Sequence, residues 1–331
     1  MTIRVGLLGR GMAGTVFHAP LIRAVPELSL AATAGSGDAA ALLADSSIDL
    51  VVIATPNASH FPLARAALEA GKHVVVDKPF AVTAGEADAL IALAAARGRM
   101  LTVFHNRRWD GDFLTVKALV ESKRLGEIRL FEAHWDRHRA APKPGWREQA
   151  GEGAGLLFDL GPHLIDQALL LFGRPDALSA DIAVQRDGAP VDDYWSLTLH
   201  YGARRVTLSA AMLVAAPRPR FALHGTSGSF VKYGLDTQEA ALKAGRGPGD
   251  TGFGQSSEDG LLTTPDGVTI QIPTERGRYA AFYRAVAAAI AGGAPPPVDP
   301  ADAREGLELI ALARRSAAEG RTLSIPSADT N

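Results

Sequence analysis

The chain has 331 residues, of which 47% are hydrophobic and 21% charged, as in an ordinary globular protein that folds around more than one core. The formal net charge of −2 excludes a broad cationic field that would hold nucleic acid or an anionic membrane. The absence of cysteine excludes disulfides, thiolate metal sites and a cysteine nucleophile. Since the N-terminus lacks the apolar run of a signal peptide and no stretch could span a bilayer, we expect a cytoplasmic protein.

The first third of the chain alternates short apolar runs with helix-like segments. Unbroken apolar runs predict buried strands at 3–8, 28–32, 49–54, 73–76 and 101–104. Helices are predicted between them at 13–24 and 60–70, and a third extends to about residue 97 from a capping box formed by Thr83 and Glu86. Strands and helices that alternate in this way pair in parallel with right-handed crossovers, so we expect a doubly wound sheet.

The second half of the chain has a different pattern. Strands are predicted in succession, without helices between most of them, at 128–135, 194–200, 204–213 and 221–224. Helices are predicted at 160–172, 279–291 and 303–319, and the Gly-rich segment 243–260 indicates a mobile loop. Consecutive strands favour an antiparallel sheet, so this half is expected to have an α+β fold.

Residues 9–14 fit the pattern G-x-G-x-x-G directly after the first predicted strand and at the start of a helix. In a phosphate loop the first glycine permits the turn, the second lets the backbone approach a pyrophosphate, and the third lets helix and strand pack closely. The alternative is a glycine-rich turn without a ligand. We expect a dinucleotide to contact Gly9, Gly11, Met12, Ala13 and Gly14.

The end of the second strand bears on which dinucleotide is bound. An NAD site usually has Asp or Glu there, whereas Thr33–Ser36 contains neither an acid nor an arginine, and Asp38 comes slightly later. Since a carboxylate would repel a 2′-phosphate, its absence favours NADP, with NAD as the other option. Thr33 and Ser36 are expected to contact the cofactor.

Asp77, Lys78 and Pro79 follow the fourth strand, and the carboxyl ends of parallel strands line the ligand crevice. Lys78 is therefore expected on the cofactor side, where the proline stiffens the turn and the peptide beside Lys78 adopts an unusual geometry. The alternative is a surface lysine at a strand end.

The segment 153–166 contains a second set of polar residues. Asp159 and His163 stand four apart at a helix start and share one face, and Asp166 lies near it. Histidine is the natural proton carrier near neutral pH, so His163 with Lys78 and Asp159 could serve alcohol oxidation. The alternative is an N-cap aspartate with a hydrogen-bonded histidine. An Asp-x-x-x-His pair could also bind a metal, but a third ligand is not evident, so we expect no metal site.

Together these motifs, with Thr55-Pro56-Asn57 and His60, resemble the glucose–fructose oxidoreductase/inositol dehydrogenase (Gfo/Idh/MocA) family over essentially the whole chain. The resemblance implies an α/β protein with two domains. Residues 1–106 would form a Rossmann domain with a doubly wound parallel sheet. Residues 107–331 would form an α+β domain whose open, mainly antiparallel sheet supports substrate binding and a homodimer or tetramer. The family usually has Glu-Lys-Pro, so Asp77 is a conservative departure.

Narrower signals at 17–22, 104–110 and 225–229 resemble the bacterial branch that contains NADP-dependent scyllo-inositol 2-dehydrogenases. By this resemblance the catalytic group is Lys78, Asp159 and His163. The cofactor would further contact Thr55, Pro56, Asn57, His60, Asp77, Lys78 and Asn106. One departure is that 33–41 is much shorter than in the family, so that the usual second helix and the strand after it are missing beside the adenosine.

Substrate residues are expected in the second half of the chain, where a polar stretch follows a strand. Polyols need paired donors and acceptors, and an apolar ring face stacks well on tryptophan, although a solvated charged loop is the alternative. The candidates are Arg108, Asp136, Arg137, Trp146, Arg147, Asp159 and His163.

The activity expected from the sequence is hydride transfer between NADP or NAD and a secondary alcohol of a sugar or inositol-like cyclic polyol. One alternative is a non-catalytic dinucleotide sensor on the same fold, which the retained Lys78, Asp159 and His163 argue against. Another is a dinucleotide-dependent glycosidase or an oxidoreductase that keeps its cofactor tightly bound.

Overall fold

The computed structural model describes residues 2–326, which form two compact units. The first unit contains the residues up to Asp110 together with Thr237–Gln255 and Gly277–Leu307. The second unit contains Gly111–Asp236, Ser256–Arg276 and, of the described residues, 308–326. Every helix of residues 2–326 falls short of the length or the hydropathy that a membrane-spanning segment needs.

The first unit is built on a five-stranded parallel sheet with the order β2-β1-β3-β4-β5. Its strands are β1 (Ile3–Leu8), β2 (Leu28–Ala34), β3 (Leu50–Ile53), β4 (His73–Asp77) and β5 (Leu101–Phe104). The expected doubly wound parallel sheet is confirmed. The three central strands are buried because their apolar side chains face helices on both sides of the sheet.

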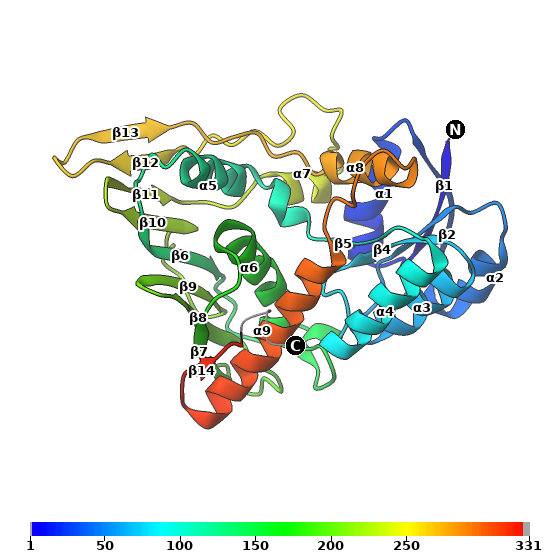
Figure 1. The fold of residues 1–331 in the computed structure, drawn as a ribbon, viewed down its shortest axis with the longest axis horizontal. Coiled ribbons are helices and arrows are strands. Elements are labelled where there is room, and N and C mark those ends of the chain that lie inside the picture. Colours follow the sequence, from blue (N-terminus) through cyan, green and yellow to red (C-terminus); the bar gives the residue numbers. More distant parts are fainter. Residues whose placement is uncertain (1, 327–331) are drawn as a thin grey trace. The chain divides into compact units, whose positions relative to one another are not determined.

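Helices cover both faces of this sheet, with α3 and α4 on one face and α1 and α8 on the other (Figure 1). The helices of the unit include η1 (Ala13–His18), α1 (Ala19–Arg23), η3 (Asn57–Ser59), α3 (His60–Glu69), α4 (Ala84–Arg97), η4 (Asn106–Trp109), α7 (Gln238–Lys243) and α8 (Ala280–Ile290). The predicted capping box opens α4, since the Glu86 main-chain N–H donates to Thr83 Oγ1 over 3.2 Å. The sequence reading missed α7.

Strand β2 lies at the edge of the first sheet, with no strand outside it among residues 2–326. The chain passes from β2 through η2 (Ser36–Asp38) and the six-residue helix α2 (Ala39–Ala44) to β3, on the other side of β1. In the common doubly wound order a further strand would lie outside β2. The expected loss of that strand is confirmed, whereas the expectation that no helix remains is wrong. Leu42 of helix α2 packs against Gly6 of β1, where a Cβ would collide with it.

The second unit contains a nine-stranded sheet with the order β13-β12-β11-β10-β6-β9-β8-β7-β14, in which only the β6–β9 pair is parallel. The strands are β6 (Ile128–Asp136), β7 (Ala177–Ala183), β8 (Tyr194–Tyr201), β9 (Arg204–Ala211), β10 (Phe221–Gly225), β11 (Gly228–Lys232), β12 (Gly260–Thr263), β13 (Thr269–Ile272) and β14 (Leu323–Ser324). The expected, mainly antiparallel sheet is confirmed. The sequence reading missed β7 and β11–β14, which are short or half exposed.

One face of the second sheet packs against helices α5 (Gly111–Glu121) and α6 (Leu156–Phe172) (Figure 1). Alternate residues of β8, including Trp195, Leu197 and Leu199, are buried, as the two-residue period of a strand requires. Helix α6 begins four residues before its predicted start. The long helix α9 (Pro300–Glu319) begins in the first unit and continues into the second.

Candidate active site

The glycines of residues 9–14 have three different environments. A Cβ at Gly9 would collide with the main-chain carbonyl of Ala54, and its φ of 133° lies in the region that favours glycine. A Cβ at Gly14 would collide with the carbonyl of Gly9. A Cβ at Gly11 would meet no atom within 4 Å, which leaves this main chain open to a ligand. The residues present therefore fit a dinucleotide pyrophosphate, with Met12 half exposed beside them.

The other predicted cofactor residues of the first unit lie at the edge of the sheet where the parallel strands end. Thr55, Pro56 and Asn57 follow β3, Asp77 and Lys78 stand at the end of β4, and Asn106 follows β5. The phosphate loop follows β1 at this same edge, so the fold brings these residues together. Thr33 and Ser36, at the end of β2, are exposed.

Asp77 is a nearly buried carboxylate at the end of β4. Burial raises its pKa, but the His18 imidazole at 3.8 Å and the charge of Lys78 more than offset this and bring the pKa of Asp77 to about 2. The main-chain N–H of Lys78 donates to Asp77 Oδ1 over 2.9 Å, and the Lys78–Pro79 peptide is cis, the unusual geometry expected beside Lys78. Asp77 therefore holds the turn that carries the Lys78 side chain.

The buried His60 contacts the main chain of two turns at the carboxyl edge of the first sheet. Its Nδ1 lies 2.7 Å from the Pro79 carbonyl oxygen, and its Nε2 lies 2.9 Å from that of Thr55. The side chain is fully buried, and burial lowers the pKa of His60. The histidine thus joins the Thr55–Asn57 turn to the Lys78 turn through main-chain oxygens.

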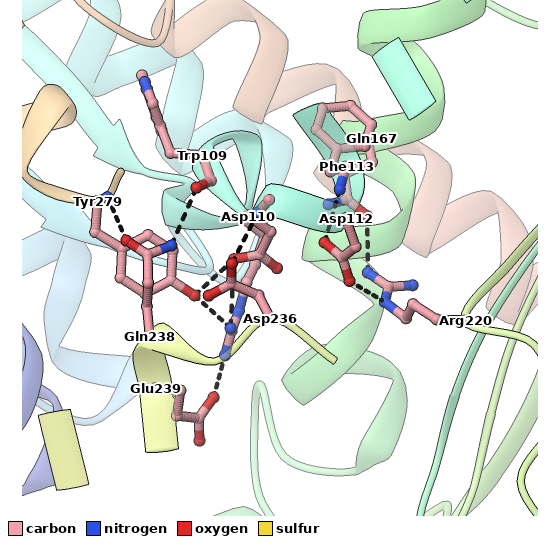
Figure 2. A network of polar contacts seen from close by, with 12 residues as sticks. Trp109, Asp110, Asp112, Phe113, Gln167, Arg220, Asp236, Gln238, Glu239 and Tyr279 are labelled. Atoms are coloured by element: carbon pink, nitrogen blue, oxygen red, sulfur yellow. Dashed lines mark hydrogen bonds and ion pairs between the residues drawn. The ribbon is translucent and has the colours of Figure 1, made fainter. Parts of the chain in front are cut away.

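A buried polar network holds η4, whose first residue is Asn106 (Figure 2). Arg107 Nη1 donates to Tyr279 Oη over 2.5 Å, and Tyr279 Oη donates to Asp110 Oδ1 over 2.6 Å. Arg107 also pairs with Glu239 of α7, and although burial raises the pKa of Glu239, Arg107 lowers it to about 2. The network ties the segment after β5 to α7 and to the residue preceding α8.

In the second unit, Asp159 and His163 occupy the first and second turns of α6. Asp159 lies between two guanidinium groups, with Arg147 Nε at 3.4 Å from Oδ1 and Arg137 Nη1 at 4.0 Å from Oδ2. The Arg147 guanidinium also lies over the Trp146 ring, 4.5 Å from its centroid. The structure thus brings together the predicted substrate residues Trp146, Arg147 and Asp159.

The loop that carries Arg137 and Arg147 is held in place by Glu148. This carboxylate accepts hydrogen bonds from Arg139 Nη1 over 2.8 Å and from Arg186 Nη2 over 3.0 Å. Arg186 is buried and also donates to the buried Asp193 over 2.8 Å. Buried, paired charges of this kind restrict the loop to one geometry, and the sequence reading named none of the residues that hold it.

Two predicted substrate residues form ion pairs with partners outside the Asp159 group. Asp136 forms a bidentate ion pair with Arg218, with distances of 2.6 and 2.7 Å. It lies there because alternate residues of β6 face opposite sides of the sheet, and the preceding Trp135 faces the helices. Arg108 belongs to the first unit, where its Nη2 donates to Asp302 over 2.9 Å.

His163 rests on an aromatic ring that the sequence reading did not single out. The Trp135 indole stacks on the His163 ring with centroids 5.7 Å apart and an interplanar angle of 29°. The buried Arg220 lies 4.9 Å from the same indole, and its Nη2 donates to Gln167 Oε1 over 3.0 Å (Figure 2). Asp112, whose pKa burial raises, lies 3.7 Å from Arg220 Nε. The alternation of apolar and polar residues along 131–136 is the sequence signal that could have pointed to Trp135.

An arginine does reach the end of β2, although the sequence near that strand contains none. The main-chain N–H of Gly9 donates to the Ala34 carbonyl over 2.9 Å, which joins the phosphate loop to the end of β2. Arg10 follows Gly9, and its Nη2 lies 3.5 Å from Asp38 Oδ2. No group of three or more His, Asp or Glu side chains that could hold a metal occurs among the described residues.

Comparisons with known proteins agree with this fold and this distribution of motifs. The model of an oxidoreductase-family NAD-binding Rossmann fold matches residues 32–105, and the model of that family's C-terminal alpha/beta domain matches residues 117–325. The chain is 47% identical to the uncharacterized oxidoreductase YdgJ of Escherichia coli, over 98% of this chain and 99% of the relative. It is 38% identical to the scyllo-inositol 2-dehydrogenase (NADP⁺) IolW of Bacillus subtilis, over 98% of this chain and 96% of the relative.

Solved structures give the same result. The YPO2259 protein of Yersinia pestis superposes with a TM-score of 0.95 at 43% identity, covering 99% of this chain and 98% of that one. An oxidoreductase from Bacillus cereus superposes with a TM-score of 0.88 at 34% identity, covering 98% and 99%. Both domain models, together with relatives that align over nearly the full length, show that this chain belongs to the Gfo/Idh/MocA family of oxidoreductases.

Proposed function

We propose that the protein is an NAD(P)-dependent dehydrogenase that acts on a secondary alcohol of a cyclic polyol or sugar. The observation that carries the proposal is the carboxyl edge of the first sheet, where the open main chain at Gly11 follows β1 and the anchored Lys78 follows β4, two parallel strands separated by β3. When bound there, the nicotinamide would accept or donate the hydride. Membership of an oxidoreductase family supports the same reading.

The proposed roles of the side chains follow from their chemistry. His163 would take the hydroxyl proton during oxidation, because a neutral imidazole is the side chain best suited to this near pH 7. The Lys78 ammonium would stabilise the developing alkoxide. Asp159 accepts hydrogen bonds and the flanking Arg137 and Arg147 donate them, so the group suits neighbouring hydroxyls of one polyol.

NADP is the proposed preferred dinucleotide. The end of β2 carries no carboxylate at residues 33–36 to accept the ribose 2′-hydroxyl of NAD. The relative IolW, which is 38% identical, is named as an NADP⁺ enzyme, and this agrees with the proposal.

A homodimer or tetramer formed through the second sheet is also proposed. The face of this sheet that points away from α5 and α6 bears small polar side chains that are half buried, such as Ser196, Thr198 and Thr207. Multi-angle light scattering of the purified protein tests this assembly, and a monomer at micromolar concentration would rule it out.

The activity is tested by incubating the purified protein with NADP⁺ or NAD⁺ and a panel of cyclic polyols and sugars while following the absorbance of the reduced nicotinamide. Asp159→Asn should lower kcat/KM for the best substrate, whereas the matched change Asp136→Asn should leave it nearly unchanged, because Asp136 pairs with Arg218. A protein that binds dinucleotide but turns over no member of the panel with either cofactor would contradict the proposal.

A further inference from the structure

Strand β2 forms the edge of the first sheet, and no strand lies outside it in the described chain. A cofactor whose pyrophosphate lies at Gly11 would extend its adenosine ribose toward the end of β2. The short turn η2 and helix α2 there provide the exposed Ser36 hydroxyl and the exposed Asp38 carboxylate. Recognition of the ribose therefore depends on very few side chains.

Arg10 is the cationic side chain that the phosphate loop adds to this place. It occupies the first variable position of G-x-G-x-x-G, and Gly9 is hydrogen-bonded to the end of β2. The Arg10 and Asp38 side chains are 63% and 65% exposed, and their charged groups are 3.5 Å apart. Such an exposed, solvent-screened ion pair contributes little free energy, so an anionic ligand can readily replace the aspartate.

We propose that Arg10 is the residue that binds the 2′-phosphate of NADP, with the Ser36 hydroxyl as a second donor, and that Asp38 keeps the guanidinium near this position before the cofactor arrives. This inference rests on the proposed function, since it concerns the same dinucleotide. It assigns the discrimination between NADP and NAD to the phosphate loop rather than to the residue that ends β2.

The charges decide which ribose is favoured. A phosphate monoester carries a charge of about −1.5 to −2 at pH 7 and offers three acceptor oxygens, which match the planar fork of a guanidinium. Without a 2′-phosphate, the described residues offer Arg10 the Asp38 carboxylate as its ion-pair partner, and NAD gains nothing from the pair. If instead Asp38 left Arg10 and accepted a hydrogen bond from a free 2′-hydroxyl, the protein would prefer NAD.

The test measures binding, so that it does not depend on finding the substrate. Calorimetric titrations of wild type and Arg10→Ala are compared for NADPH and NADH, and for the fragments 2′,5′-ADP and 5′-AMP. We expect Arg10→Ala to weaken NADPH and 2′,5′-ADP by about 10- to 100-fold, the range for hydrogen bonds to a charged group. NADH and 5′-AMP should change by less than about threefold, and Arg10→Lys should lie between, because it keeps the charge without the bidentate geometry.

Two further variants control for general effects of charge and for the role of Asp38. Arg65→Ala removes an arginine of similar exposure (59%) that pairs with Glu69 on α3, and it should change none of the four affinities. Asp38→Asn should bind NADPH as tightly as wild type or a few-fold more tightly. An NADPH affinity that is insensitive to Arg10→Ala would overturn this inference alone. A wild-type preference for NADH that is lost in Asp38→Asn would also overturn it. A protein that binds neither dinucleotide would overturn the proposed function as well.

Discussion

Replacing Trp135 by leucine tests whether the indole positions His163 or only fills the core. Trp135 is 2% exposed. Its indole contacts two side chains that are distant in sequence, the stacked His163 ring and the Arg220 guanidinium. The ring pair is worth about 0.5–1.5 kcal/mol. The desolvated cation over the indole is worth about 2 kcal/mol. With the lost volume, we expect Trp135→Leu to lower the free energy of unfolding by roughly 2–4 kcal/mol.

A matched control separates positioning from packing. Trp195 of β8 is 1% exposed, and both tryptophans pair with Ala210 of the intervening strand β9, so they face the same side of the sheet. Trp195→Leu should therefore cost a similar free energy of unfolding. Only Trp135→Leu removes the surface on which His163 rests.

The assay compares kcat and the KM for the alcohol for both variants, together with unfolding by urea. We expect Trp135→Leu to reduce kcat by roughly 10- to 100-fold, the scale associated with a displacement of about 1 Å at a reacting group. Trp195→Leu should keep kcat within about twofold, and Trp135→Phe should recover most of the loss because it retains a flat ring. If both leucine variants lost stability but kept the same kcat, the stack would have no role in positioning His163.

Four other substitutions address the cofactor loop, the reacting groups and the buried acid. Gly11→Asp should abolish dinucleotide binding in calorimetry, because a carboxylate would occupy the open approach to the pyrophosphate; normal affinity would remove the phosphate-loop assignment. His163→Ala and Lys78→Ala should each lower kcat by about 10²- to 10⁴-fold with dinucleotide affinity retained, and the double variant should be little worse if the two act as a unit. The pKa of Asp77 is about 2 in the fold and 3.8 without it, so its ionised form should stabilise the protein by roughly 2 kcal/mol above pH 5, and this is lost as the pH falls toward 2. Denaturation at pH 7 and pH 3 measures how much the free energy of unfolding falls between these pH values. The fall should be smaller for Asp77→Asn than for wild type, and an equal fall would refute this origin of the low pKa of Asp77.

The amino-acid sequence by itself determined the features that depend on neighbours along the chain. The apolar runs defined the five parallel strands, and G-x-G-x-x-G located the turn whose second glycine is open in the structure. Thr83 and Glu86 marked the start of α4, and the four-residue spacing of Asp159 and His163 placed them on one face of α6. These features were predictable because helix and strand periods and capping are local interactions.

The tertiary structure decided which distant side chains meet. Asp136 and Trp135 are neighbours in sequence, but the two-residue period of β6 and the helices on one face send Asp136 to Arg218 and Trp135 to His163. The Arg137–Asp159 and Arg147–Asp159 pairs depend on the loop that Glu148 holds, and its partner Arg186 is far along the chain. Arg10 reaches Asp38 only because β1 and β2 are adjacent and parallel, so that their carboxyl ends share one edge. No local pattern encodes these pairs, since strand order and long-range packing bring the residues together.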